Sequence, residues 1–147
     1  MQKPEPHILT IFGASGDLAR RKLIPSIYNL YIQDLLPEKF ALLGTGRKEY
    51  TDESFREHMQ EALETFSGDD ADPARVKKFL EYLYYISIDT ADPVEYTRLK
   101  NKLDRLAELR DTRDNHIFYL ATPPSLYAKV AHSLADQGLA RSRNEKK

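Results

Sequence analysis

The sequence contains no cysteine, and this absence excludes two kinds of site. The 147 residues can form neither a disulfide bond nor a thiolate metal centre. A chain without cysteine is compatible with a reducing compartment, so we expect a cytoplasmic protein. No metal site of another kind is predicted.

Long apolar runs and an excess of basic charge are also missing. No stretch is long and apolar enough for a transmembrane helix, and no signal peptide or lipid-anchor motif is present. Lysine and arginine number 22 against 23 acidic residues, so the net charge of −1 provides no basic field for nucleic acid. We therefore expect no membrane partner and no nucleic-acid partner.

What the sequence does contain is an alternation of short apolar runs and amphipathic segments. Four runs are predicted strands: 8–12, 40–44, 84–88 and 116–121. Because segments with helical spacing separate them, the predicted fold is α/β, a Rossmann-like doubly wound parallel sheet that stops after about four strands. The length favours one domain, which we place at residues 1–139, followed by a charged tail at 140–147.

Several residues predict where helices begin, bend or pack. Thr51-Asp52 and Asp92-Pro93 are typical of helix starts, and Glu95, three residues after Asp92, completes a capping-box pattern. Pro25 predicts a kink or restart in the first helix, because proline lacks the backbone N–H. The last helix is expected to bury a stripe that includes Leu126, Val130, Ala131 and Leu134.

The first predicted strand leads into a glycine turn, Gly-Ala-Ser-Gly at residues 13–16. A strand, glycine turn and helix in this order direct unpaired N–H groups and the positive end of a helix dipole toward a phosphate. The spacing Gly-x-x-Gly-x-x-Ala differs by one position from the common dinucleotide motif Gly-x-Gly-x-x-Gly. The turn alone therefore predicts a phosphate site and no particular ligand. Asp17 has an alternative structural role as a helix cap.

The residues after the second predicted strand favour one dinucleotide over another. In this fold the adenosine ribose lies there, and an NAD site usually offers an acidic side chain to its 2′-hydroxyl. This chain has Arg47 and Lys48 instead, and a guanidinium suits a 2′-phosphate, so NADP is the predicted cofactor. The alternative is that Arg47 is a solvated loop cation.

Taken together, these motifs resemble the N-terminal part of the glucose-6-phosphate dehydrogenase family. The resemblance is carried by Gly13-Ala-Ser-Gly-Asp-Leu-Ala, Arg21-Lys-Leu-Ile-Pro, Gly44-Thr-Gly-Arg, Asp89-Thr and Phe118-Tyr-Leu-Ala-Thr-Pro-Pro, and it covers essentially the whole chain. It implies that the glycine turn holds the NADP pyrophosphate and that Arg47 takes the 2′-phosphate. It also implies that residues 1–139 are a dinucleotide-binding domain that is incomplete at its C-terminal end.

The resemblance assigns further residues to the coenzyme. Asp89 and Thr90 match positions near the adenosine, Lys22 matches a lysine between coenzyme and sugar, and Pro123-Pro124 matches a turn near the nicotinamide half. The alternative for Lys22 is a solvated helix face. The full expected set is Gly13, Ala14, Ser15, Gly16, Asp17, Leu18, Ala19, Arg20, Lys22, Arg47, Asp89, Thr90 and Pro124.

The residues that perform the family's reaction are absent. That reaction, in the oxidative pentose phosphate route, transfers a hydride from C1 of glucose 6-phosphate to NADP while a histidine oriented by an aspartate removes a proton. In the family this histidine lies in an Arg-Ile-Asp-His motif, which this chain lacks. Four histidines are expected to be structural or solvated: His7, His58, His116 and His132. No catalytic residue is predicted, and we expect the chain alone to be inactive.

The resemblance also implies that the full-length enzyme binds glucose 6-phosphate and is a homo-oligomer. Two alternatives to a fragment of an enzyme remain open. The chain is then either a noncatalytic NADP-binding module or sensor, or a short sheet that scarcely folds because its fourth strand has an exposed edge.

Overall fold

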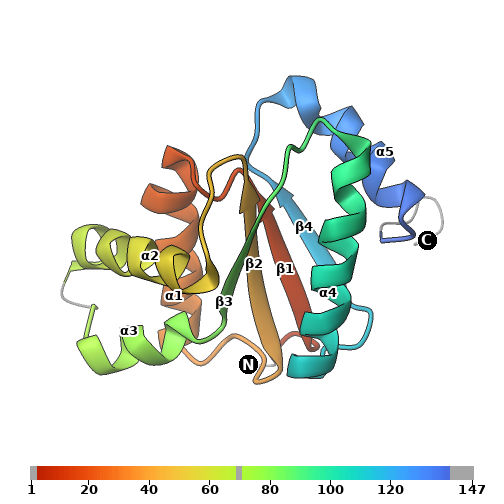
Figure 1. The fold of residues 1–147 in the computed structure, drawn as a ribbon. Helices are drawn as coiled ribbons and strands as arrows, with labels where there is room; N and C mark the ends of the chain where they lie inside the picture. Colours follow the sequence, from red (N-terminus) through yellow and green to blue (C-terminus); the bar gives the residue numbers. More distant parts are fainter. Residues whose placement is uncertain (1–2, 69–70, 140–147) are drawn as a thin grey trace.

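The computed structural model of the chain describes residues 3–68 and 71–139, which form a four-stranded parallel sheet with helices on both faces (Figure 1). The strands are β1 (His7–Phe12), β2 (Phe40–Gly46), β3 (Leu83–Ser87) and β4 (His116–Leu120). Their spatial order is β3-β2-β1-β4, and every neighbouring pair is parallel. The predicted α/β fold is confirmed.

The helices divide between the two faces of the sheet. One face carries the π-helical turn η1 (Ala19–Leu23) with α1 (Ile24–Ile32), α2 (Asp52–Phe66) and α3 (Pro73–Leu80). The other face carries α4 (Tyr96–Arg110) and α5 (Tyr127–Asp136), each preceded by a 3₁₀ turn, η3 (Pro93–Glu95) and η4 (Pro124–Leu126). Since β4 lies beside β1, the strand order reverses between them, and ligands bind at such switch points in open α/β sheets.

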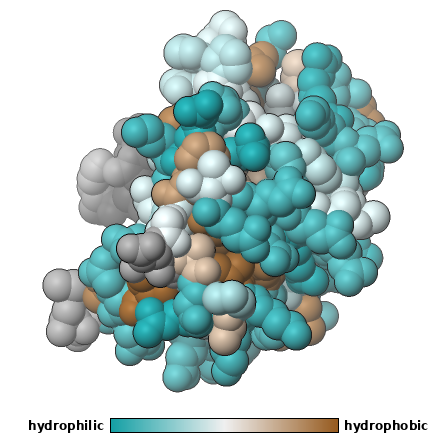
Figure 2. All heavy atoms as spheres, turned by 90° about the vertical axis from the view of Figure 1, so that its left-hand side faces the viewer, coloured by the Kyte–Doolittle hydropathy of each residue, from teal (hydrophilic) through white to brown (hydrophobic). Residues whose placement is uncertain are grey.

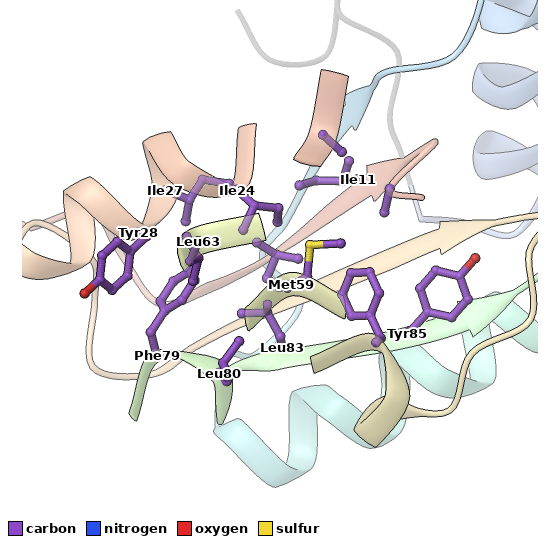
Figure 3. Packing of buried hydrophobic residues seen from close by; sticks show 14 of the residues in the cluster. Ile11, Ile24, Ile27, Tyr28, Met59, Leu63, Phe79, Leu80, Leu83 and Tyr85 are labelled. Carbon is purple, nitrogen blue, oxygen red and sulfur yellow. The ribbon is translucent and has the colours of Figure 1, made fainter. Parts of the chain in front are cut away.

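Strand β2, one of the two central strands, is buried throughout because it faces a core on each side. Phe40 and Leu42 belong to the core under α1, α2 and α3, whereas Ala41 and Leu43 belong to the core under α4 and α5. Figure 3 shows the first core, where Met59 of α2 lies among residues from β1, β3 and α1. The outer surface on this side is mostly hydrophilic (Figure 2).

The interruption expected at Pro25 takes the form of a π-helical turn. The Ile24 N–H donates to the carbonyl of Ala19, five residues earlier, so η1 contains one extra residue before α1 begins. Pro25 is the second residue of α1, and its missing N–H removes the bond that would otherwise hold the α-helical register there.

The predicted helix starts are confirmed at α2 and only partly at Asp92. Thr51 Oγ1 accepts from the Ser54 N–H at 3.0 Å, and Ser54 Oγ accepts from the Thr51 N–H at 2.9 Å. Asp92 accepts from the N–H two residues further on at 3.0 Å. Glu95, however, accepts from the Asp89 N–H at 3.2 Å, so the reciprocal half of the predicted capping box is wrong. The 3₁₀ turn directs Glu95 toward the end of β3.

The last strand and helix are less covered than the sequence predicts. In α5, Val130, Ser133 and Leu134 are buried, whereas Ala131 is exposed, so its predicted place in the buried stripe is wrong. The helix meets the sheet over a narrower face than the apolar spacing suggests. Within the described residues β4 pairs with β1 alone. The predicted charged tail at 140–147 lies outside the described residues.

Candidate functional site

The glycine turn is fixed to the end of β2 by its backbone. The N–H groups of Gly13 and Ala14 both donate to the Thr45 carbonyl, at 2.8 and 3.1 Å, and the Gly16 N–H donates to the Gly13 carbonyl at 3.0 Å. The turn that follows β1 is thereby held against the last residues of β2. Thr45 was not among the predicted site residues, because an ordinary strand threonine gives no sequence signal for this role.

Glycines allow this close approach of the backbone. Gly13 has φ +88°, and a Cβ there would lie 2.7 Å from the Ala121 carbonyl oxygen at the end of β4. At Gly44 a Cβ would lie 2.8 Å from the Cβ of Ala14. The turn therefore packs between the ends of β2 and β4 only because both positions lack a side chain.

The start of the helix after the turn offers hydrogen-bond donors. Within residues 3–68 and 71–139, the N–H groups of Ser15, Asp17 and Leu18 have no acceptor, as is usual for a first helical turn. The Asp17 carboxylate pairs with Arg21 at 3.1 Å instead of capping the helix. Arg20 Nε is buried without a partner in the same part of the chain. This set of donors suits the oxygens of a pyrophosphate.

Other residues predicted for the coenzyme differ in what they expose. The side chains of Ala14 and Ala19 are fully buried, so only their backbone can touch a ligand. Pro124 is exposed at the start of η4. Lys22 is exposed and lines a pocket of about 290 Å³ with residues that include Phe66, between α1 and the end of α2. Lys22 therefore does not line the cleft beside Arg47.

That cleft, of about 600 Å³, opens at the carboxyl ends of β2 and β3. Its lining comes from the loop after β2, from β3 and from the beginning of α4, and includes the side chains of Arg47, Glu49, Asp89, Glu95 and Arg98. The structure thus brings together two of the predicted residues, Arg47 and Asp89, with three charged residues that were not predicted for the coenzyme site. Glu95 ends the 3₁₀ turn η3 and Arg98 lies in the first turn of α4, where sequence spacing alone shows a charged outer face.

Arg47 presents an exposed guanidinium to this cleft. Its side chain is 79% exposed, and Nη2 forms a long ion pair with Asp89 Oδ2, at 3.6 Å. Asp89 Oδ1 accepts from the Ala91 N–H at 3.0 Å. Thr90 is buried, and its carbonyl accepts from the Tyr96 hydroxyl at 2.8 Å. The fork of Arg47 is therefore available for an oxyanion, whereas the Thr90 side chain is not exposed.

Tyr85 of β3 positions the loop that carries Arg47. Its hydroxyl donates to the Lys48 carbonyl at 2.6 Å, and its ring packs edge-on against Tyr50. Burial raises the pKa of Tyr85 to about 12, so the phenol stays protonated and remains a donor at neutral pH. A tyrosine near the end of a predicted strand is unremarkable in sequence, and this role was missed.

The four histidines lie apart from the cleft in the described structure. His58 stacks on Tyr50, and burial, followed by the charge of Arg20, lowers its pKa. His116 begins β4, and burial lowers its pKa as well. His7 begins β1, and His132 lies 3.3 Å from Asp136 on α5.

The described part of the chain shows neither a metal-binding cluster nor a membrane-spanning helix. Residues 3–68 and 71–139 contain no group of three or more metal-ligating side chains. In the same ranges, no helix has the length and apolar character needed to cross a bilayer.

Comparison with known proteins identifies the family. Residues 10–147 match the family model described as glucose-6-phosphate dehydrogenase, NAD binding domain. The chain belongs to the glucose-6-phosphate dehydrogenase family. The predicted resemblance is thereby confirmed.

Individual glucose-6-phosphate dehydrogenases match over nearly the whole chain. The glucose-6-phosphate 1-dehydrogenase of Treponema pallidum (strain Nichols) is 46% identical over 139 residues, 94% of this chain and 27% of the relative. That of Leuconostoc mesenteroides is 34% identical over 132 residues, 90% of this chain and 26% of the relative. The chain thus spans about a quarter of the length of these relatives.

A solved structure shares the fold. A glucose-6-phosphate dehydrogenase in complex with its substrate glucose 6-phosphate superimposes with a TM-score of 0.79 at 29% identity, covering 97% of this chain and 29% of that one. The glucose-6-phosphate 1-dehydrogenase of Mycobacterium avium gives the same TM-score at 28% identity.

Proposed function

We propose that this chain is the coenzyme-binding part of an NADP-dependent glucose-6-phosphate dehydrogenase, which oxidises C1 of glucose 6-phosphate and transfers a hydride to NADP. Family membership supports the reaction class. The observation that carries the choice of NADP is the exposed Arg47 guanidinium in the loop directly after β2. The glycine turn is bonded to Thr45, two residues before Arg47, so both phosphate-binding elements are supported by the end of β2.

In this proposal the coenzyme lies across the carboxyl ends of the strands. The N–H groups of Ser15, Asp17 and Leu18 and the Arg20 side chain hold the pyrophosphate, and Arg47 holds the 2′-phosphate. Asp89 and Thr90 follow the end of β3 and lie beside the adenosine. Pro124 borders the nicotinamide half, and Lys22 reaches toward the sugar from η1. Gly13, Ala14 and Ala19 determine the backbone conformation and packing of the turn.

NADP supplies the hydride acceptor when it is bound, and the residues described here bind and orient it. The family's Arg-Ile-Asp-His motif is absent from the sequence. We therefore propose that these 147 residues do not oxidise glucose 6-phosphate alone, and that the complete enzyme is a cytoplasmic homo-oligomer of the oxidative pentose phosphate pathway. Detectable NADP reduction by the purified 147-residue chain would contradict the first of these statements.

The substitution Arg47→Ala tests the choice of coenzyme. We expect the Kd for NADP to rise about 30-fold, because a charge-assisted pair with phosphate contributes about 2 kcal/mol. The Kd for NAD, which lacks the 2′-phosphate, is expected to change less than about threefold. Isothermal titration of both coenzymes measures the difference.

Lys48→Ala is the matched control, because it removes a neighbouring loop cation that does not line the cleft. We expect it to change NADP binding less than about threefold. Equal weakening of NADP and NAD by Arg47→Ala would show that Arg47 does not recognise the 2′-phosphate.

A further inference from the structure

A second arginine, Arg98, lines the same cleft from the first turn of α4. Its Nη1 donates to the Ser87 carbonyl at 2.8 Å and to Glu95 Oε1 at 3.2 Å. The Nε and Nη2 donors have no acceptor within the described residues, and the side chain is 53% exposed. Arg98 is thus held by one side of its guanidinium, and the other donors are free.

Ser87, the last residue of β3, connects the two arginines. Its hydroxyl donates to the Arg47 carbonyl at 3.3 Å, and its own carbonyl accepts from Arg98. A single residue therefore positions the backbone of one arginine and the guanidinium of the other. This arrangement joins the loop after β2 to the start of α4 across the cleft.

The charges of the cleft show why one arginine is not enough for a phosphate. Three carboxylates line it, those of Glu49, Asp89 and Glu95, against the two guanidinium groups of Arg47 and Arg98. With Arg47 alone the carboxylates would outnumber the guanidinium groups by two, and Arg98 reduces this excess to one. Arg98 pairs with Glu95 at 3.2 Å and so offsets the carboxylate nearest to it.

We propose that Arg98 is a second specificity-determining residue, which binds the 2′-phosphate of NADP together with Arg47. The inference rests on the proposed function, because it takes the cleft as the site of the 2′-phosphorylated ribose. Two guanidinium groups facing one phosphate provide several charge-assisted hydrogen bonds from fixed directions. Binding of a 2′-hydroxyl requires none of them, so Arg98 favours NADP over NAD.

The test compares two small probes that differ only by the 2′-phosphate, adenosine 2′,5′-bisphosphate and adenosine 5′-monophosphate. Titration calorimetry with the 147-residue chain gives the ratio of their affinities. We expect Arg98→Gln to lower this ratio about tenfold, with the affinity for adenosine 5′-monophosphate changed less than about twofold.

Arg105→Gln is the matched control. Arg105 lies seven residues further along the exposed side of α4, about 10 Å from Arg98 along the helix axis. This variant removes the same charge from the same helix without touching the cleft, and we expect an unchanged affinity ratio. A fall in the ratio equal to that of Arg98→Gln would attribute the effect to net charge and overturn the proposal.

The remaining outcomes are also decisive. If Arg98→Gln weakens both probes equally, Arg98 only supports the end of β3 and the proposal is wrong. If the unaltered chain binds both probes equally, the NADP preference itself fails, and this inference fails with it. If the unaltered chain prefers the bisphosphate and Arg98→Gln leaves the ratio unchanged, the proposed function stands. The proposal that Arg98 binds the 2′-phosphate is then wrong.

Discussion

Gly13 is the residue at which one added methyl group would most disturb the site. Its φ of +88° is costly for any side chain, and a Cβ would lie 2.7 Å from a backbone oxygen that cannot move independently of β4. The same position anchors the turn to Thr45. Residue identity here determines whether the phosphate-binding turn can form at all.

Gly13→Ala is therefore expected to lower the free energy of unfolding by about 3 kcal/mol, the sum of the positive-φ cost and the steric overlap. Urea denaturation measures it. Gly138→Ala is the control, because Gly138 also has positive φ, +73°, and nothing lies within 4 Å of its Cβ position. We expect Gly138→Ala to lower the free energy of unfolding by about 1 kcal/mol. Equal losses at the two positions would refute the steric argument.

At the residue scale, the sequence predicted Arg47 and Asp89 for the coenzyme site but not Tyr85 or Arg98. Arg47 was predicted because the residue after the second strand lies beside the adenosine ribose in this fold, where a cation suits a 2′-phosphate. The roles of Tyr85 and Arg98 depend on the direction of their side chains, at the end of a strand and at the start of a helix. No local pattern encodes those directions, because distant contacts determine them.

At the scale of elements, Asp52 joins three of them. Its carboxylate accepts from the Tyr85 N–H of β3 at 2.8 Å and from Lys102 Nζ of α4 at 3.2 Å, while Asp52 itself begins α2. The charged side chain thus connects helices from opposite faces around the edge strand. It fixes the element that supports one wall of the cleft.

Asp52→Ala is expected to cost about 2 to 3 kcal/mol of stability, because it leaves a strand N–H without its charged acceptor. Asp104→Ala removes an exposed carboxylate that pairs with Lys100 on the surface of α4, and it should cost less than about 0.5 kcal/mol. Chemical denaturation of both variants gives the comparison. A loss below 1 kcal/mol for Asp52→Ala would mean that the connection does not stabilise the fold.

Helices and strands were predictable where the apolar pattern was periodic and where the helix cap was a contact between residues close in sequence. Thr51 is an example, since its partner lies three residues away. The Asp92 pattern failed in part because Glu95 found a better-placed donor at Asp89, at the end of a strand. The prediction for Ala131 was wrong because apolar spacing predicts a stripe on the helix but not the width of the sheet surface on which the helix packs.

At the scale of the whole molecule, the two faces of strand β4 are buried to different extents. Phe118 and Leu120 of β4 pack on the core under α4 and α5, whereas Ile117 and Tyr119 are 49% and 43% exposed on the other side. Within the described residues, no strand pairs with the outer edge of β4. An apolar, unpaired edge strand invites association with other chains.

Ile117→Lys is expected to suppress self-association of the 147-residue chain, because a charge on an edge strand opposes pairing. Sedimentation velocity at increasing protein concentration measures it. Leu109→Lys is the control, because Leu109 is 67% exposed on α4, away from any strand edge. If both variants associate as the unaltered chain does, β4 is not the contact.

The paired bonds from Gly13 and Ala14 to the Thr45 carbonyl also bear on the timing of coenzyme capture. Because these bonds directly follow the last paired residues of β1 and β2, the glycine turn is in place as soon as the two strands have paired. No binding free energy is consumed in ordering the turn, and association is governed by encounter rather than by loop closure. The amides of Gly13 and Ala14 then exchange with solvent only when this end of the sheet opens.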